Sequence, residues 1–282
     1  MNLLSGKKCL ITGASSGLGF ELTKLFVQQG AEVIMLCRDE KKGTAIIQNI
    51  IHEKPDAQIH LELADLASLQ SVYSFINRVK TKYTELDVLI NNAAILKTEI
   101  TKTIDGFESM FQVNYLSPFI ITNSLVDLLK LGTNAKIINI TLPPEKYQLN
   151  LDDLQSLNSY KPMEVLFKTK LCLLLFTLEF AERIKDSNIA VVAGVPNKKP
   201  FKSGLGREMP AIMRFIMRLI STDANKVAQN ILYHASTDNL KTGTVFNEKE
   251  IVPLASSWKD TNLRMELWNQ TNNMIDNWLG AN

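Results

Sequence analysis

Cysteine is scarce in this chain of 282 residues, and its three cysteines lack the spacing of a metal-ligand or redox motif. The sequence therefore predicts buried thiols in a reducing compartment rather than disulfides. Long apolar runs are also missing, because the most apolar one, residues 171–176, is far shorter than the roughly 20 residues of a membrane span. Residues 1–8 lack the apolar core of a secretory signal. We expect a soluble, cytoplasmic protein.

Charge of one sign is not in excess, since 31 Lys and Arg residues stand against 29 Asp and Glu, a net charge of +2. This balance predicts no nucleic-acid partner and no strongly acidic one. The three histidines have no metal partner at ligand spacing, so no metal site is predicted. Repeats, linkers and low-complexity tails are absent as well. With 45% hydrophobic residues, the chain is long enough for one large domain over residues 1–282.

Glycines are concentrated where they are most informative, in the stretch Thr-Gly-Ala-Ser-Ser-Gly-Leu-Gly at residues 12–19. A short apolar run precedes this stretch, and apolar side chains at helical spacing follow it. The context predicts a turn between a buried strand and a helix, whose first N–H groups favour an anion such as a phosphate. An ordinary glycine-rich turn is the alternative interpretation. The candidate contacts are Gly13, Ser15, Ser16, Gly17, Leu18 and Gly19.

Strand and helix patterns alternate along the rest of the chain. Strands are predicted at residues 8–12, 32–37, 58–63, 88–90, 135–141, 189–193 and 243–246. Helices are predicted from the glycines to residue 29 and at residues 39–54, 68–83, 106–131, 160–185 and 223–236. This alternation indicates a doubly wound, Rossmann-like α/β domain with a parallel sheet covered on both faces. Ligands in that fold class lie at the carboxyl ends of the strands.

Four motifs, each at a predicted strand end or helix, resemble those of the short-chain dehydrogenase/reductase family. They are the glycine turn, Asp65-Leu66, Asn91-Asn92-Ala93-Ala94, and Phe111-Gln112-Val113-Asn114. Residues 37–39, 153–156 and 263–268 are similar to the retinol-dehydrogenase-like branch. The resemblance implies cofactor contacts from Asp65, Leu66, Asn92, Ala93 and Ala94, and a catalytic role for Asn114.

The residue after the second predicted strand bears on the choice of cofactor. An acidic side chain there would bind the ribose hydroxyls of NAD. This sequence has Arg38, whose guanidinium can pair with a 2′-phosphate, and Lys41 and Lys42 add positive charge nearby. The sequence therefore predicts NADP(H), with a solvated loop charge as the alternative role for Arg38.

The catalytic positions depart from the family pattern, which uses a serine, a tyrosine and a lysine. Lys170 resembles the lysine, which also binds the cofactor, but Leu166 stands at the tyrosine position and Leu142 at the serine position. Leucine cannot donate a proton, so we expect ordinary carbonyl and alcohol oxidoreduction to be weak or lost. An active or repurposed NADPH-dependent enzyme with a substitute proton donor stays open, as does a non-catalytic protein that senses the cofactor or binds a partner.

Substitute proton donors are few. Tyr160 lies six residues before Leu166, about 9 Å along a helix, which is too far for a simple replacement. Thr141 is expected to face the other side of its strand from Leu142. The loop at residues 145–147 could fold back over the site.

Two further segments have predicted roles. Residues 198–222 stand where the family has its substrate lid and carry an apolar stripe. The stripe fits a wall for a hydrophobic small-molecule substrate, a peripheral contact with a membrane or partner, or packing on its own domain. The helix at residues 160–185 is apolar nearly all round, which predicts burial on several sides. Because the corresponding helix of the resembling family often packs against its copy, we predict a homodimer.

Overall fold

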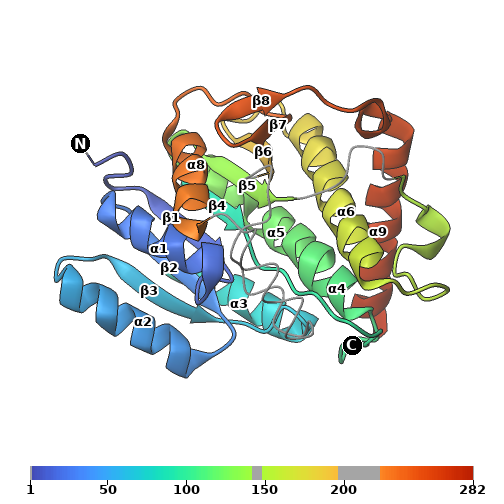
Figure 1. Ribbon diagram of the computed structural model, residues 1–282, viewed down its shortest axis with the longest axis horizontal. Coiled ribbons are helices and arrows are strands. Elements are labelled where there is room, and N and C mark those ends of the chain that lie inside the picture. Colours follow the sequence, from blue (N-terminus) through green and yellow to red (C-terminus); the bar gives the residue numbers. More distant parts are fainter. Residues whose placement is uncertain (1, 142–147, 196–222, 282) are drawn as a thin grey trace.

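A single sheet forms the centre of the computed structural model, which describes residues 2–141, 148–195 and 223–281 (Figure 1). Its strand order is β3-β2-β1-β4-β5-β6-β7-β8. The strands are β1 (Lys8–Thr12), β2 (Glu32–Cys37), β3 (Ile59–Leu63), β4 (Val88–Asn91), β5 (Lys136–Ile140), β6 (Ala190–Val195), β7 (Thr244–Asn247) and β8 (Glu250–Val252). The pairings from β3 to β7 are all parallel, as the alternating pattern predicts. The edge strand β8 was not predicted, and it pairs with β7 in antiparallel fashion.

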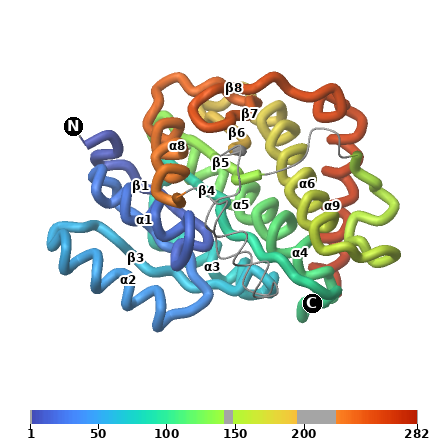
Figure 2. Tube along the Cα trace, viewed as in Figure 1, coloured from blue at the N-terminus to red at the C-terminus, as the bar shows by residue number. Residues whose placement is uncertain are grey.

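Helices cover both faces of the sheet, so the doubly wound prediction is confirmed (Figure 2). One face packs against α1 (Gly17–Gln28), α2 (Glu40–Glu53) and α8 (Ala224–Ser236). The other packs against α3 (Leu69–Lys82), α5 (Ser117–Leu131), α6 (Pro162–Arg183) and α9 (Thr261–Ala281). None of the described helices is long and apolar enough to cross a membrane. Side chains alternate between the two cores along each strand, as Cys9 and Leu10 do in β1.

The helix predicted over residues 106–131 is interrupted, which corrects the prediction. A short α4 (Ser109–Phe111) leads into a π-helical turn, η1 (Gln112–Leu116), before α5 begins. The N–H of Ser117 donates to the carbonyl of Gln112, five residues earlier. Pro118 explains the wider turn, because it has no N–H to donate and its ring would clash with the carbonyl of Asn114.

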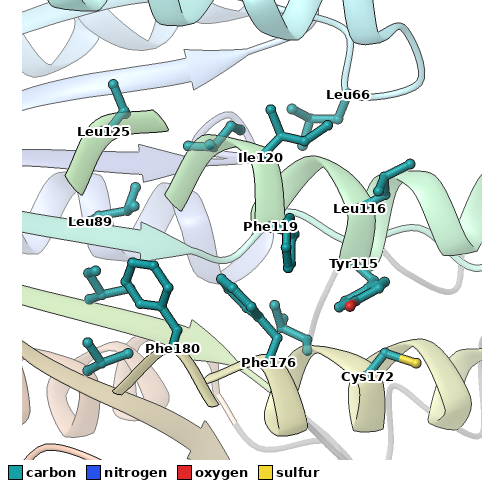
Figure 3. Packing of buried hydrophobic residues seen from close by; sticks show 14 of the residues in the cluster. Leu66, Leu89, Tyr115, Leu116, Phe119, Ile120, Leu125, Cys172, Phe176 and Phe180 are labelled. Atoms are coloured by element: carbon teal, nitrogen blue, oxygen red, sulfur yellow. The ribbon is translucent and has the colours of Figure 1, made fainter. Parts of the chain in front are cut away.

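The apolar helix α6 is buried by its own chain, since α9 packs along it (Figure 1). Trp268 of α9 stacks on Phe176 and Phe180, with ring centroids 6.0 and 6.3 Å apart, and Arg183 lies over the indole at 4.1 Å. Phe119 of α5 joins the same aromatic cluster, with its ring centroid 4.8 Å from that of Phe176 (Figure 3) and 5.0 Å from that of Trp268. Helix α9 was not predicted. The homodimer stays a prediction, and the apolar surface that suggested it is already covered.

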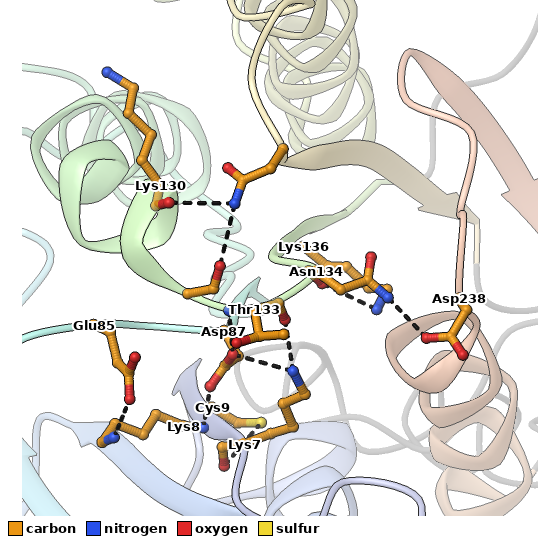
Figure 4. A network of polar contacts seen from close by, with 12 residues as sticks. Lys7, Lys8, Cys9, Glu85, Asp87, Lys130, Thr133, Asn134, Lys136 and Asp238 are labelled. Carbon is orange, nitrogen blue, oxygen red and sulfur yellow. Dashed lines mark hydrogen bonds and ion pairs between the residues drawn. The ribbon is translucent and has the colours of Figure 1, made fainter.

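A polar network closes the edge of the sheet where the parallel strands begin (Figure 4). Asp87 is buried and accepts hydrogen bonds from the backbone N–H groups of Lys8 and Thr133, both at 2.8 Å, and from Lys7 Nζ at 3.3 Å. The carboxylate ties β1 to the segments beside β4 and β5. This network stabilises one end of the sheet and leaves the other end, where the strands finish, to the predicted site.

Candidate cofactor and active site

The turn between β1 and α1 depends on glycine at particular positions. Gly13 and Gly17 have φ angles of +66° and +53°, in the left-handed region that glycine adopts without strain. A Cβ on Gly13 would lie 2.9 Å from the Cα of Ala93. A Cβ on Gly19 would collide with the carbonyl oxygen of Gly13 and lie 2.7 Å from Nδ2 of Asn92. These close approaches shape the turn so that the start of α1 faces the cavity described below.

Asn92 holds the end of β4 against this turn. Its Nδ2 donates to the carbonyl of Thr12 at 2.9 Å. In return, Oγ1 of Thr12 accepts from the backbone N–H groups of Asn92 and Ala93, each at 3.0 Å. The two predicted cofactor motifs, far apart in sequence, are therefore joined at the carboxyl ends of neighbouring strands.

A cavity of about 840 Å³ lies at these strand ends. Of the predicted site residues, it is lined by Gly13, Ser15, Ser16, Leu18, Arg38, Asp65, Leu66, Asn92, Ala93, Ala94, Leu166 and Lys170. Gly17, Gly19 and Asn114 do not line the cavity. They shape or hold the backbone segments whose other residues line it. Leu142, the loop at residues 145–147 and the lid segment at residues 198–222 lie outside the described residues.

One end of the cavity carries free positive charge. Arg38 follows β2 and is exposed, and within the described residues its side chain has no hydrogen bond or ion pair. Cys37 beside it is buried, and burial raises the pKa of its thiol, which keeps it neutral. Asp65, which follows the neighbouring strand β3, accepts a hydrogen bond from the N–H of Ala67 at 3.0 Å, which orients its carboxylate. The guanidinium is therefore the group at this end that can bind an anionic ligand.

Asn114 is fully buried in the π-helical turn and holds the loop after β4 in place. Its Oδ1 accepts from the N–H of Ile95 at 2.7 Å, and its Nδ2 donates to the Ile95 carbonyl at 3.0 Å. The same Nδ2 donates to Thr169 Oγ1 of α6 at 3.2 Å. Asn114 is a positioning residue in this arrangement, because it connects the loop to the helix that carries Lys170.

Lys170 lines the cavity and is otherwise buried, so that the residue as a whole is 5% exposed. Its Nζ donates to the carbonyl of Ile140 at 2.8 Å. Burial lowers the pKa of this ammonium to about 8. Leu166, one helical turn earlier, is also 5% exposed and belongs to an apolar cluster with Leu96 and Val165. The amine therefore lies beside an apolar wall of the cavity.

Two hydroxyl groups near this wall differ in their placement. Thr141, predicted to face away, lines the cavity, because β5 ends at Ile140 and strict alternation ends with it. Its Oγ1 donates to the carbonyl of Gly194 at 3.3 Å. Tyr160 packs against the cluster of Leu166, and its hydroxyl donates to the carbonyl of Lys97 at 3.2 Å, outside the cavity lining.

The loop between β4 and α4 contributes a wall that the sequence did not predict. It adds to the lining Ile95, Leu96, Lys97, Thr101, Lys102, Thr103 and Ile104. No motif marks these residues, and they reach the cavity only because Asn114 and Asn92 hold the loop. Among the described residues, no group of three or more His, Cys, Asp and Glu side chains could hold a metal ion.

Comparison with known proteins identifies the family. The profile of the short chain dehydrogenase family matches residues 7–147. Mouse retinol dehydrogenase 14 is 34% identical over 295 aligned residues, which cover 97% of this chain and 87% of that protein. The chain belongs to the short-chain dehydrogenase family. The WW domain-containing oxidoreductase of Drosophila melanogaster is 30% identical, over 96% of this chain and 69% of that protein.

Solved structures share the fold. An uncharacterized protein from Mycobacterium paratuberculosis is 27% identical, with a TM-score of 0.76 over 96% of this chain and 94% of that one. A short chain dehydrogenase from Burkholderia cenocepacia in complex with NADP has a TM-score of 0.68 at 21% identity, over 86% of this chain and 96% of that one. Family membership implies a nicotinamide dinucleotide, and the glycine turn, the start of α1 and the free Arg38 fit such a ligand.

Proposed function

We propose that this chain binds NADP(H) and an apolar carbonyl or alcohol compound at a centre that has lost the family's proton donor. Ordinary carbonyl and alcohol oxidoreduction is then weak or lost. The observation that carries the proposal is Leu166, which stands one turn before Lys170 in a buried apolar cluster. A positioned general acid contributes roughly 10²- to 10⁴-fold in rate, and leucine contributes none of it.

The hydroxyl groups nearby are engaged elsewhere. Thr141 donates to the Gly194 carbonyl and Tyr160 to the Lys97 carbonyl, so neither takes the place of a phenol beside Lys170. Leu142 stands at the serine position in the sequence. The lysine and Asn114 remain, and they suit binding and orientation of a ligand.

The preference for NADP(H) follows from charge at the adenosine end. Arg38, which has no partner among the described residues, stands where an acidic side chain would bind a ribose hydroxyl. A guanidinium can form two parallel hydrogen bonds with a 2′-phosphate. Lys41 and Lys42 follow within one turn at the start of α2 and strengthen the local positive potential.

The apolar ligand is inferred from the opposite end of the cavity. Leu96, Val113, Ile140 and Leu166 all contribute to the lining there. Apolar walls of this kind favour ligands with extended hydrocarbon groups. Several relatives are named retinol dehydrogenases, and another is named polyprenol dehydrogenase, so their names point to the same class of ligand.

Calorimetry and an NADPH consumption assay on one preparation test the proposal. We expect NADPH to bind more tightly than NADH, Arg38→Asp to reverse that order, and a panel of aldehydes and ketones to give no turnover above the protein-free rate. Equal affinities for NADPH and NADH would refute the charge argument. Robust turnover by the unmodified chain would refute the loss of the proton donor.

A gain-of-function variant sharpens the test. Leu142→Ser combined with Leu166→Tyr should yield measurable carbonyl reduction, because the phenol would stand beside Lys170 and meet the charge that favours its ionised form. The matched control is Leu142→Ser with Leu166→Phe, which adds the same ring without the hydroxyl and should stay inactive. Either ring overpacks the cluster by roughly 1–3 kcal/mol, so both variants are first checked for cooperative unfolding.

A second candidate function is an active reductase in which the hydroxyl of Thr141 serves the substrate oxygen. Its support is that Thr141 lines the cavity next to Ile140. This candidate requires turnover by the unmodified chain and its loss in Thr141→Val, which keeps the side-chain shape and removes the hydroxyl.

A further inference from the structure

Lys170 is a buried amine that forms no ion pair with any of the described residues. Its Nζ donates to one neutral acceptor, the Ile140 carbonyl, at 2.8 Å. The nearby charges on the same helix are engaged elsewhere, since Glu179 pairs with Arg183 at 2.9 Å and Lys168 donates to the Asp153 carbonyl at 2.6 Å. Burial is what lowers the pKa of Lys170 to about 8. About a quarter of such amines are neutral at about pH 7.5, against roughly one in a thousand for an exposed lysine.

The amine also lies where a ligand can reach it. Lys170 lines the cavity together with Leu166, Ile140, Val113 and Leu96, while Lys168 does not. A neutral amine on an apolar wall is a nucleophile, as it is in enzymes that form Schiff bases. The leucine at position 166 matters here, because it leaves the amine without a phenol as its neighbour.

We propose that Lys170 captures an apolar aldehyde as a covalent imine in this cavity. The nitrogen lone pair attacks the carbonyl carbon and a C–N bond forms. The carbonyl oxygen then leaves as water, carrying both protons of the amine, and a C=N bond remains. No oxidant or reductant takes part. The imine and the cofactor contact expected of Lys170 exclude each other, so the site would hold an aldehyde reversibly in the cofactor-free chain and release it by hydrolysis.

The aldehyde class follows from the same geometry. Aldehyde carbonyl carbons are open to attack, whereas a ketone places two carbon groups against the side chains of Leu166 and Ile140 beside the amine. A carboxylic acid would pair with the ammonium form and would not become covalently attached. The proposal rests on the proposed function to the extent that Leu166 replaces the proton donor.

Reductive trapping tests the inference on the whole 282-residue chain without added cofactor. The probe is octanal with sodium cyanoborohydride at about pH 7.5, and peptide mass spectrometry then measures alkylation at each lysine. We expect Lys170 to be modified about tenfold more than Lys168, which is equally shielded and on the same helix but away from the cavity. Modification of Lys170 at or below the level of Lys168 would overturn the proposal.

Two variants and one further measurement complete the design. Lys170→Arg should abolish the selective adduct, and Lys168→Arg should leave it intact; an unchanged adduct pattern in Lys170→Arg would contradict the assignment. The melting temperature with and without NADPH, measured on the same preparation, reports the cofactor site separately. Stabilisation by NADPH without an adduct on Lys170 overturns the imine alone. An adduct without stabilisation by NADPH supports the imine and refutes the proposed cofactor.

Discussion

Replacing Lys170 with methionine should stabilise the fold at neutral pH and do so less as the pH rises. The methionine side chain has a similar length but lacks the amine, and burial disfavours the protonated form of that amine. The pKa of this lysine is about 8 in the folded chain and about 10.4 in an unfolded one. Each pKa unit corresponds to 1.36 kcal/mol, so the buried ammonium lowers the free energy of unfolding by about 3 kcal/mol at pH 7.

Methionine removes that penalty but leaves the Ile140 carbonyl without its donor, a loss of about 1–2 kcal/mol. The net expectation at pH 7 is a gain of roughly 1–2 kcal/mol in the free energy of unfolding. Between pH 8 and about 10.4 the unfolded lysine still holds its proton while the folded one has lost it. The unfolded state therefore binds more protons, and the stability of the unmodified chain rises with pH through this window.

Urea unfolding of both proteins at a series of pH values measures this difference, and the other titrating groups cancel because they are shared. The advantage of Lys170→Met should shrink through that window and reverse near its upper end. Lys168→Met is the control, since it removes the bond to the Asp153 carbonyl and should be less stable at neutral pH. A Lys170→Met variant that is less stable at pH 7, or whose stability runs parallel to that of the unmodified chain, would refute the reasoning.

Three other predictions concern packing and turns. Gly13→Ala should lower the free energy of unfolding by roughly 1–2 kcal/mol and abolish stabilisation by NADPH, because it strains a positive φ and presses on Ala93, as thermal unfolding would show. Asp105→Ala should lower it by roughly 2–4 kcal/mol in urea unfolding, since Leu69, Gln112 and Trp278 all donate to that carboxylate. Trp268→Ala should lower it by about 3 kcal/mol, and light scattering should then detect association through uncovered α6.

The parts of the fold that the sequence predicts well are those governed by local periodicity. The parallel strands alternate side chains between two cores, and those from β1 to β5 are each followed by a helix whose apolar face packs on one of the cores. The glycine turn and the loop after β4 could be placed together because carboxyl ends of parallel strands meet at one edge. That logic predicts much of the cavity lining from residues far apart in sequence.

What the sequence did not reveal depends on contacts between distant elements. The π-helical turn needs the conflict between Pro118 and the Asn114 carbonyl, which helical periodicity does not show. Helix α9 has a weak apolar stripe and gains its helical state by packing on α6. Thr141 lies beyond the end of β5, so the alternation of side chains along a strand does not determine which way its side chain faces.

The covering of α6 by α9 has a consequence for how this chain is made. Synthesis proceeds from the N-terminus, so α6 is made well before residues 261–281 exist. Until then Phe176 and Phe180 lack the indole of Trp268, and the nascent chain presents an apolar surface that chaperones bind. A ribosome that stops before Thr261 would release a chain that has every described residue of the cavity lining but an open core, which quality control would remove.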